Sequence, residues 1–316
     1  MTIRNFKNCD AENLLSLWNV AHPRYKLSKE LMAKKIFLDV NFSSENILIV
    51  EKEDKIIAFA YLPYHTVKLN KNFPFNEKEG FITYFSVDPN ENFEEVGKML
   101  LKACEEYHYN AGRTVLSTAY APLYHLQGFS ESEDAKYIEL FSSFGYNECK
   151  SYSRRMSLAE FKLPENFEER KAALEQKGFY IGELPYNHLA EFVSSENCFS
   201  NAAWSWEYGT RLSHNPDLSR ARVAIYDGKI IGGCMFSDPN SDSGRFGPFG
   251  INPKFRGNGI GSVLFNDCLN EMKAKGISSA WAQWTPPDGT ANILYNKAGF
   301  LMEDCFYTFS KELTNV

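Results

Sequence analysis

A glycine-rich turn between an apolar strand and a helical segment constrains this chain more than any other feature. Residues 250–261 read Gly-Ile-Asn-Pro-Lys-Phe-Arg-Gly-Asn-Gly-Ile-Gly, and apolar residues then recur at helical spacing through Gly259–Lys275. The first N–H groups of a helix lack intrahelical partners and carry partial positive charge. Because glycines have no side chains, a phosphate group can approach this backbone closely. The turn therefore predicts a site for a pyrophosphate, with Arg256 adding a fixed charge.

Two other kinds of phosphate-binding loop are disfavoured. A dinucleotide-binding turn has the spacing Gly-x-Gly-x-x-Gly after the first strand of its domain. Here that spacing is missing, and the preceding strand lies in the middle of its half. A P-loop needs Gly-Lys-Ser/Thr, and no lysine separates Gly261 from Ser262.

A second segment narrows the kind of protein that the glycine-rich turn indicates. Residues 291–300 read Ala-Asn-Ile-Leu-Tyr-Asn-Lys-Ala-Gly-Phe. In order and separation, the two segments resemble motif A and the Ala-x-x-Leu-Tyr-x-Lys-x-Gly-Phe signature of the GNAT acetyltransferases. The resemblance covers the second half of the chain, from about Leu163 to Val316, and the first half only in layout. It implies an acetyl-CoA-dependent N-acetyltransferase whose chemistry lies in the second half.

The resemblance also implies a cofactor site. In the family, the backbone of the central strand pairs with the pantetheine arm, and that strand is interrupted by a bulge. The Gly and Pro residues of Gly247–Gly250 favour such an interruption. The residues expected to bind acetyl-CoA are Phe249, Gly250, Ile251, Arg256, Gly257, Asn258, Gly259, Ile260, Gly261, Ser262 and Asn292.

Tyr295 matches the position of the family's usual general acid, which would protonate the departing CoA thiolate. The alternative for Tyr295 is a packed helix aromatic. Asp288 stands where the family often has an Asn; it either caps the following helix or acts catalytically at the acceptor amine. No acid lies within Arg245–Ile251, so the general base is Asp288, an upstream acid such as Glu207 or Asp238, or a chain of waters.

The first half repeats the plan of the second. Expected strands are Phe179–Leu184, Arg222–Tyr226, Ile230–Phe236, Arg245–Ile251, Ser278–Trp284 and Phe300–Phe309, and earlier Asn46–Glu51, Lys55–Tyr64, Phe81–Val87 and Thr114–Thr118. Expected helices are Asn187–Asn197, Gly259–Lys275 and Asp288–Ala298, and earlier Phe93–Tyr109 and Ala135–Phe144. We therefore expect an α/β (α+β) protein of two tandem GNAT domains, residues 1–160 and 161–316. Each has a central mixed, mostly antiparallel sheet flanked by helices.

The first half departs from the motif at the positions that carry chemistry. Asn92 replaces the arginine of the turn, Phe93 and Glu95 replace its first two glycines, and Phe141 replaces the tyrosine. Negative charge at Glu95 would repel a pyrophosphate, and phenylalanine has no proton to donate. We expect a GNAT-like domain that has lost acetyl-CoA binding and is structural or forms a wall of the acceptor pocket.

The acceptor is predicted from layout and aromatic residues. Tandem proteins of this length resemble mycothiol synthase and bacterial glucosamine or glucosaminide N-acetyltransferases, and a chain rich in Lys, Asn, Phe and Ile suits the second kind. Trp204, Trp206 and Trp284 are the expected substrate-binding residues, with core packing as the alternative. Trp281 and Trp284 have odd spacing on one strand, which would place them on opposite faces. A protein or peptide acetyltransferase and a non-catalytic acyl-CoA-binding module remain alternatives.

Composition and residue spacing argue against several other classes of protein. The net charge of −6 argues against a general nucleic-acid binder. Seven scattered cysteines show no metal-ligand spacing, so we expect no metal and reduced thiols. No apolar run approaches the ~20 residues that span a bilayer, and the N-terminus does not resemble a signal peptide. The expected location is cytoplasmic, and the expected partner is a small-molecule amine. We expect the protein to bind neither nucleic acid nor a membrane.

Overall fold

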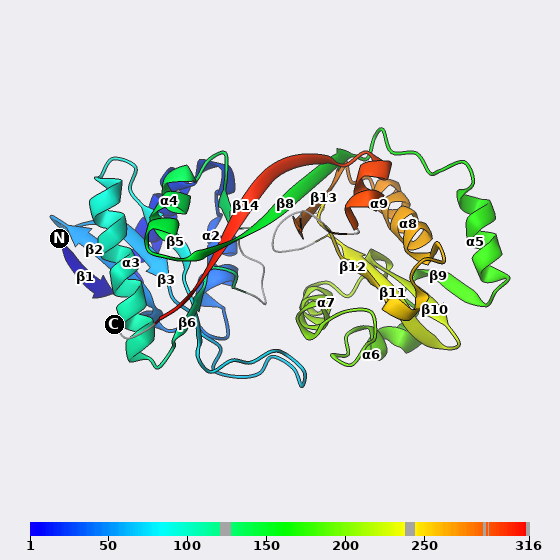
Figure 1. Ribbon diagram of the computed structural model, residues 1–316, viewed down its shortest axis with the longest axis horizontal. Helices are drawn as coiled ribbons and strands as arrows, with labels where there is room; N and C mark the ends of the chain where they lie inside the picture. Colours follow the sequence, from blue (N-terminus) through cyan, green and yellow to red (C-terminus); the bar gives the residue numbers. More distant parts are fainter. Residues whose placement is uncertain (121–127, 238–243, 287–288, 290, 314–316) are drawn as a thin grey trace. The chain divides into compact units, whose positions relative to one another are not determined.

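A computed structural model gives the structure of residues 1–120, 128–237, 244–286, 289 and 291–313 (Figure 1). The chain forms two compact units. Unit 1 comprises Met1–Val67, Phe75–Lys150 and Phe306–Val316, and unit 2 comprises Lys68–Pro74 and Ser151–Cys305. The chain passes between the units on either side of Lys68–Pro74, and again within two long strands, β8 (Asn147–Ser157) and β14 (Leu301–Glu312). The division of the sequence repeat at residues 160 and 161 remains a prediction.

Unit 2 is built on an antiparallel four-stranded sheet in the order β12-β11-β10-β9. Its strands are β9 (Phe179–Glu183), β10 (Ala221–Tyr226), β11 (Lys229–Phe236) and β12 (Phe246–Ile251). The hairpin between β10 and β11 turns at Asp227 and Gly228, both with positive φ, as the Asp-Gly pair predicts. This sheet carries the predicted turn at the end of β12, its edge strand.

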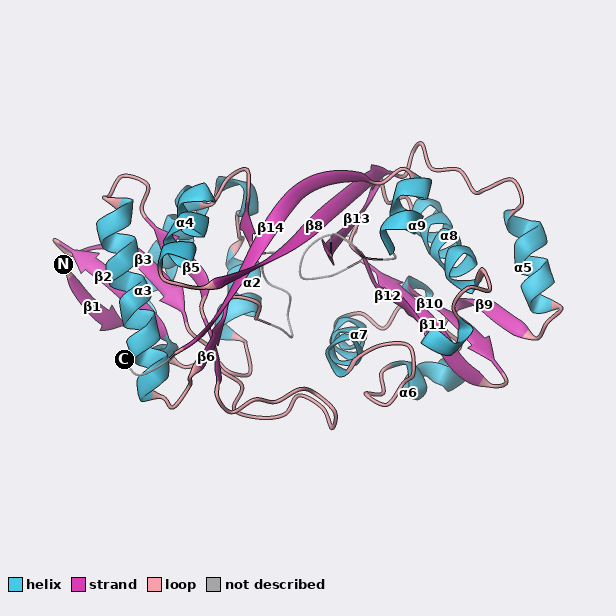
Figure 2. Ribbon diagram, viewed as in Figure 1, coloured by secondary structure: helices cyan, strands magenta, loops and turns pink. Residues whose placement is uncertain are grey.

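Helices cover both faces of this sheet (Figure 2). α8 (Ile260–Ala274) packs on one face through its apolar stripe, which the helical periodicity predicted. α6 (Leu189–Phe192) and α7 (Ala202–His214) pack on the other face, in a second apolar cluster. The remaining elements of unit 2 are α5 (Phe167–Glu175), β13 (Ser279–Thr285), which pairs with residues 152–157 of β8, and α9 (Ala291–Ala298).

Unit 1 contains an antiparallel sheet in the order β1-β2-β3-β5. Its strands are β1 (Thr2–Asn5), β2 (Ile47–Lys52), β3 (Lys55–Tyr61) and β5 (Thr83–Val87). α1 (Ala11–Ala21) and α3 (Phe93–Asn110) pack against it. A second group of strands comprises β4 (Glu79–Phe81), β6 (Val115–Ser117), β7 (Phe129–Ser130) and the end of β14, and α4 (Ala135–Ser143) contacts β7.

The predicted strands and long helices are present within a few residues of their expected ends, with one exception. Asn187–Asn197 was expected to form one helix, but the helix within it ends at Phe192. The Asn197 side chain donates to the carbonyl oxygens of Phe192 and Ser194, and it accepts from the N–H of Ser200. Because this short polar side chain offers the backbone an alternative to helical bonding, the helix stops early. α1, α2 (Lys29–Met32), α7, β1, β4, β7 and β8 were not expected.

Candidate active site

The predicted glycine turn leads directly into α8 in unit 2. Gly257 and Gly259 have φ of 83° and 81°, in the left-handed region that disfavours residues with a Cβ. Gly259 is the N-cap of α8, and no side chain of its own covers the first N–H groups of the helix. A Cβ at Gly257 would meet no atom within 4 Å, so the space beside the turn is open. The turn has the geometry and the space that a phosphate group requires.

Two arginines flank this turn. Arg256 is exposed, and its Nε donates to the Ile251 carbonyl oxygen at 3.0 Å, which holds the turn against the end of β12. Arg170 of α5 places Nη1 3.5 Å from the Ser262 Oγ in the first turn of α8. A Cβ at Gly259 would lie 3.3 Å from Arg170 Nη2, so this guanidinium lies against the turn. Both charges complement an anion bound there.

Sequence reasoning missed Arg170, because the charged segment Glu165–Lys177 around it is typical of a solvated helix face. Phe167 and Leu174 are buried, and Arg170 shares their face of α5 at spacings of three and four. A cationic residue on the apolar face of a short helix was the signal available in the sequence.

β12 is interrupted where the Gly-Pro pair predicted. The register with β11 shifts between Cys234 and Phe236, and β12 holds one extra residue opposite that step. Two α7 side chains satisfy the carbonyl oxygens of the interruption. Arg211 Nη1 donates to Gly247 at 2.8 Å, and the Tyr208 hydroxyl donates to Pro248 at 3.0 Å. As an edge strand, β12 also has backbone groups on its outer side that β11 does not use.

A buried ion-pair network lies beside the interruption. Glu207 Oε1 is 2.5 Å from Arg211 Nη2 and 3.1 Å from Arg245 Nη2, and all three residues are at most 5% exposed. With its amide oxygen turned toward it, Gln283 also accepts from Arg245. Glu207 was one candidate base, but its carboxylate is shared between two guanidinium groups, which argues for a structural role. The other two acids considered, Asp238 and Asp288, lie outside the described residues.

Tyr295 lies on α9 in the main core of unit 2. Its ring contacts those of Phe246, Phe265 and Phe300 edge-on or tilted, and the residue is 5% exposed. Burial raises the pKa of the Tyr295 phenol above its usual value. The phenol therefore stays protonated at neutral pH, which both a proton donor and a packed core tyrosine require.

The tryptophans are placed differently from one another. A Cβ at Gly250 would lie 3.0 Å from the Trp204 ring, so this ring lies against β12 itself. Trp206 packs in a small cluster with Leu69 and Phe73, which also belong to unit 2. Trp284 has φ of 57° at a register shift between β13 and β8. This bulge breaks the strict alternation from which opposite faces were predicted for Trp281 and Trp284.

The other expected cofactor residues lie close together in the fold. Phe249, Gly250 and Ile251 end β12, Asn258 is exposed in the turn, and Ile260, Gly261 and Ser262 begin α8. Asn292 lies on α9 and is buried, at 9% exposed, as Ile251 and Ile260 also are. Its amide donates to the Pro286 carbonyl oxygen at 2.9 Å, which anchors the loop before α9.

The corresponding turn of unit 1 is capped by its own residues. The Asn92 side chain accepts from the N–H of Glu95 at 3.3 Å and so occupies the N-cap of α3. Phe93 packs edge-on against Tyr137, and Phe141 is fully buried. The Asn92 side chain thus occupies the position at the α3 terminus that the glycine turn of unit 2 leaves without a side-chain cap.

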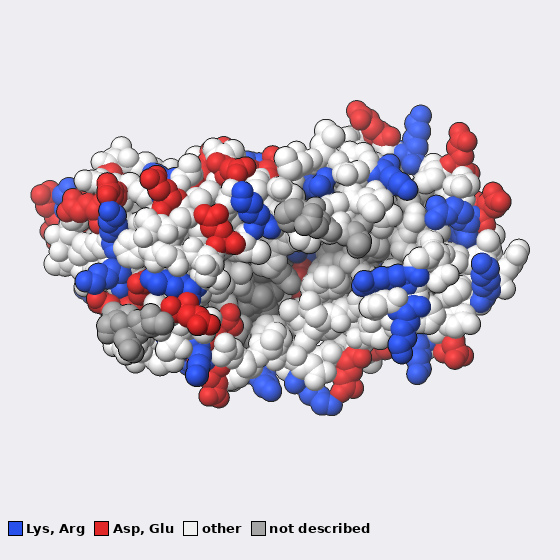
Figure 3. All heavy atoms as spheres, viewed as in Figure 1, with Lys and Arg blue, Asp and Glu red and all other residues white. Residues whose placement is uncertain are grey.

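Charge and metal-ligand patterns add little to the site. On the face drawn in Figure 3, basic and acidic side chains are interspersed over both units. Within the described ranges, no group of three or more His, Cys, Asp or Glu could hold a metal ion. No helix among these residues is long and apolar enough to cross a bilayer.

Comparisons with known proteins agree with this architecture. Residues 187–300 match the model of the acetyltransferase (GNAT) family. No curated protein matches the chain. A solved GCN5-related glucosamine N-acetyltransferase region of a fungal multi-domain β-N-acetylglucosaminidase is 15% identical with a TM-score of 0.78, over 98% of this chain and 38% of that longer chain.

Two further structures are similar over almost their whole lengths. A GCN5-related N-acetyltransferase from Sphaerobacter thermophilus is 15% identical with a TM-score of 0.67, over 98% of this chain and 95% of that chain. A tandem GNAT protein from the clavulanic acid biosynthesis pathway is 13% identical with a TM-score of 0.67, over 100% of this chain and 99% of that chain. At these identities the likeness establishes the fold alone, and it confirms the prediction of a tandem GNAT fold.

Proposed function

Because residues 187–300 match the model of the acetyltransferase (GNAT) family, we propose that this chain transfers an acetyl group from acetyl-CoA to a primary amine of a small molecule. The observation that carries the proposal is the open glycine turn at the N-terminus of α8, with Arg170 and Arg256 beside it. The turn fits the pyrophosphate of CoA through backbone N–H groups and two guanidinium groups.

The edge of β12 fits the rest of the cofactor. Its outer backbone groups would bind the pantetheine arm, as a peptide strand would be bound at a sheet edge. The bound cofactor supplies a thioester, whose carbonyl carbon accepts the amine. Tyr208 and Arg211 hold the carbonyl oxygens of Gly247 and Pro248 on the α7 side, which fixes the interrupted segment in place. A rigid strand at this point orients the donor relative to the acceptor.

Tyr295 is the proposed proton donor to the leaving thiolate. Its raised pKa keeps the phenol protonated until the thiolate forms. Glu207 is unsuited to remove the proton from the amine, since Arg211 and Arg245 hold its carboxylate. The base is therefore Asp288, Asp238 or bound water in this proposal.

An amino sugar is the proposed acceptor class. The Trp204 ring lies against Gly250, beside the strand that would hold the thioester, and aromatic faces stack well on sugar rings. The similarity in fold to a region named as a glucosamine N-acetyltransferase supports the same choice. We further propose that residues 1–160 form a domain that does not bind acetyl-CoA, because the Asn92 side chain caps the α3 helix terminus and Glu95 in its first turn carries negative charge.

The test is CoA release from acetyl-CoA with glucosamine, a chitosan oligomer, cysteinyl-glucosamine and a lysine peptide. We expect fast turnover on glucosamine or its oligomers. Tyr295→Phe should lower kcat by about 10²–10⁴-fold if the phenol is the acid. Tyr226→Phe, a tyrosine at the surface of the same unit, is the matched control and should retain activity.

Each other outcome contradicts a defined part of the proposal. Turnover on the peptide alone would replace the amino-sugar acceptor with a protein or peptide. Binding of acetyl-CoA without turnover on any amine would favour a regulatory acyl-CoA-binding module. Full activity of Tyr295→Phe would assign Tyr295 to core packing.

A further inference from the structure

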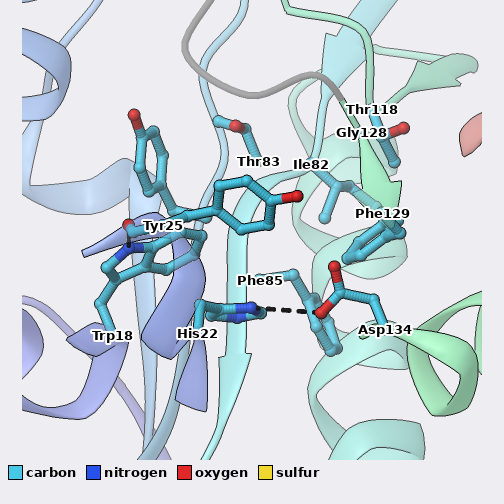
Figure 4. A pocket seen from close by; sticks show the side chains of 11 residues that line it. Trp18, His22, Tyr25, Ile82, Thr83, Phe85, Thr118, Gly128, Phe129 and Asp134 are labelled. Atoms are coloured by element: carbon cyan, nitrogen blue, oxygen red, sulfur yellow. Dashed lines mark hydrogen bonds and ion pairs between the residues drawn. The ribbon is translucent and has the colours of Figure 1, made fainter. Parts of the chain in front are cut away.

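Unit 1 holds a cavity at the point where its chain changes sheets. β4 pairs with β6, whereas β5, which begins two residues later, pairs with β3. Near the start of β5, Tyr84 has φ of 52°, and the register of β3 with β5 shifts. The strands separate here and leave a cavity (Figure 4), in which the centres of water molecules can occupy about 30 Å³. That is room for about two waters, or for one small polar group entering from outside.

One corner of the cavity is polar and built from buried groups. His22 Nδ1 lies 3.4 Å from Asp134 Oδ1, and each residue is 4% exposed. The His22 ring stacks on Trp18 with centroids 4.1 Å apart, and the other Asp134 oxygen accepts from the Ser130 N–H at 2.9 Å. These contacts hold both side chains in orientation, and Figure 4 shows the one between His22 and Asp134.

His22 has an acceptor to spare. With Nδ1–H directed at the carboxylate, Nε2 carries the lone pair, and it has no hydrogen-bond partner among the described residues. Leaving a buried polar nitrogen unpaired costs about 1–3 kcal/mol. A ligand that brings an N–H or O–H donor would remove that cost.

The rest of the wall selects a cation. Trp18, Tyr25, Phe85 and Phe129 line the cavity, and no Lys or Arg does so among the described lining residues. Aromatic faces attract a positive charge, and the Asp134 carboxylate adds a negative one. A neutral hydroxyl would satisfy Nε2 but would gain neither of these interactions.

We propose that unit 1 binds the ammonium group of a small primary amine in this cavity, with His22 as acceptor and Asp134 as counter-charge. The ammonium enters the narrow space, and the remainder of the amine lies toward its opening. No acetyl transfer is assigned to this site, because Asn92 caps the adjacent helix and Glu95 opposes a phosphate. The site is a binding site, and it does not depend on the catalysis proposed for unit 2.

Trp18 gives a local measurement of this binding. It is the only tryptophan before residue 204, and it stacks directly on His22. The experiment follows the ¹⁵N-indole NMR signal of Trp18 in the full chain, assigned with Trp18→Phe and recorded without acetyl-CoA. Ethanolamine and glucosamine are titrated against their neutral partners, ethylene glycol and N-acetylglucosamine, at constant ionic strength.

We expect a saturable shift of the Trp18 signal with the two amines and none with the neutral compounds. His22→Phe, which preserves the stack on Trp18, and Asp134→Asn should each weaken binding at least about tenfold, as loss of a charged hydrogen bond does. His108→Gln changes another buried histidine of unit 1 that does not line the cavity, and it should leave binding intact.

Three results would overturn the proposal: no shift with either amine, an equal shift with the neutral partners, or unchanged binding in His22→Phe. Asp134→Asn could fail to fold, because Asp134 also accepts a hydrogen bond from Ser130. In that case, the comparison of amines with neutral compounds on the wild type, together with His22→Phe, still tests the proposal. A Trp18 response without any acetyl transfer would reject the function proposed for unit 2 and keep this site. Acetyl transfer without a Trp18 response would reject this binding site and keep the function proposed for unit 2.

Discussion

The guanidinium of Arg211 on α7 donates a 2.8 Å hydrogen bond to the carbonyl oxygen of Gly247 in the interruption of β12. Arg211 is 1% exposed and also pairs with Glu207. A buried arginine is costly unless its partners are all present. The bond therefore makes the conformation of the interrupted strand depend on a helix that precedes it by about 35 residues.

Arg211→Met should destabilise unit 2 by about 3–5 kcal/mol, because it leaves the Glu207 charge and the Gly247 carbonyl without this partner. Tyr208→Phe removes one hydrogen bond to Pro248 at nearly constant shape and should cost only about 1 kcal/mol. Chemical unfolding of both variants measures the difference. Equal stability of Arg211→Met and the wild type would mean that the network does not hold β12.

A side chain added at Gly257 should weaken the binding of acetyl-CoA without meeting any atom of the protein itself. Gly257→Ala places a Cβ where no protein atom lies within 4 Å, at φ of 83°. Gly276→Ala, past the other end of α8, has φ of 75° and the same empty surroundings. Both should lose about 1–2 kcal/mol of stability from left-handed backbone strain. Only Gly257→Ala should raise the KM for acetyl-CoA, and an equal KM in both variants would contradict a phosphate site.

Arg170→Gln should raise the KM for acetyl-CoA about tenfold while leaving kcat largely unchanged. A charge-assisted hydrogen bond to a phosphate contributes about 1.5–3 kcal/mol to binding, and Arg170 lies against Gly259 and Ser262, where the phosphate is proposed to bind. Arg155→Gln, which removes a partly exposed ion pair with Glu303 in the same unit, is the control. Steady-state kinetics at varied acetyl-CoA distinguishes them, and a fall in kcat alone would exclude a binding role.

The stability of unit 1 should fall on acidification through two buried histidines. Burial lowers the pKa of His108 and that of His65 to about 4. The unfolded chain, with a histidine pKa of about 6.5, therefore binds more protons between pH ~6.5 and ~4. Stability is unaffected by these groups above that window and declines as pH falls through it, by up to about 1.4 kcal/mol per pH unit for each histidine.

His108→Gln should make this decline shallower, and His214→Gln, an exposed histidine on α7, should not. Unfolding free energies at pH 7.5 and pH 5 give the comparison. An identical decline in the wild type and His108→Gln would show that His108 is not the titrating group.

The end of the chain should stabilise the unit formed mainly by its beginning. Phe309 on β14 is 1% exposed and stacks on Phe141 of α4 with centroids 5.3 Å apart. Phe309→Ala should cost about 3–5 kcal/mol and reduce hydrogen-exchange protection in β6 and α4. Leu301→Ala, at a 75% exposed position of the same strand, should have little effect. Loss of protection confined to unit 2 would contradict this assignment.

The local elements follow from the sequence because their signals are local. Asp227-Gly228 predicted a hairpin, and both residues adopt the positive φ that such a turn requires. The apolar spacing of residues 260–272 predicted a one-sided helix, and that face is buried. The glycine turn was likewise predicted from residues adjacent in the chain, although its binding of acetyl-CoA stays a prediction.

Tertiary structure alone decided which distant groups meet. Nothing in the residues around Arg170 places it at Gly259, because that contact depends on how α5 packs against α8. The pairing of Arg211 with Gly247, of His22 with Asp134, and of Phe309 with Phe141 has the same origin. Sequence determines backbone preference and periodicity over a few residues, whereas such contacts depend on the packing of whole elements, which the burial of apolar faces sets collectively.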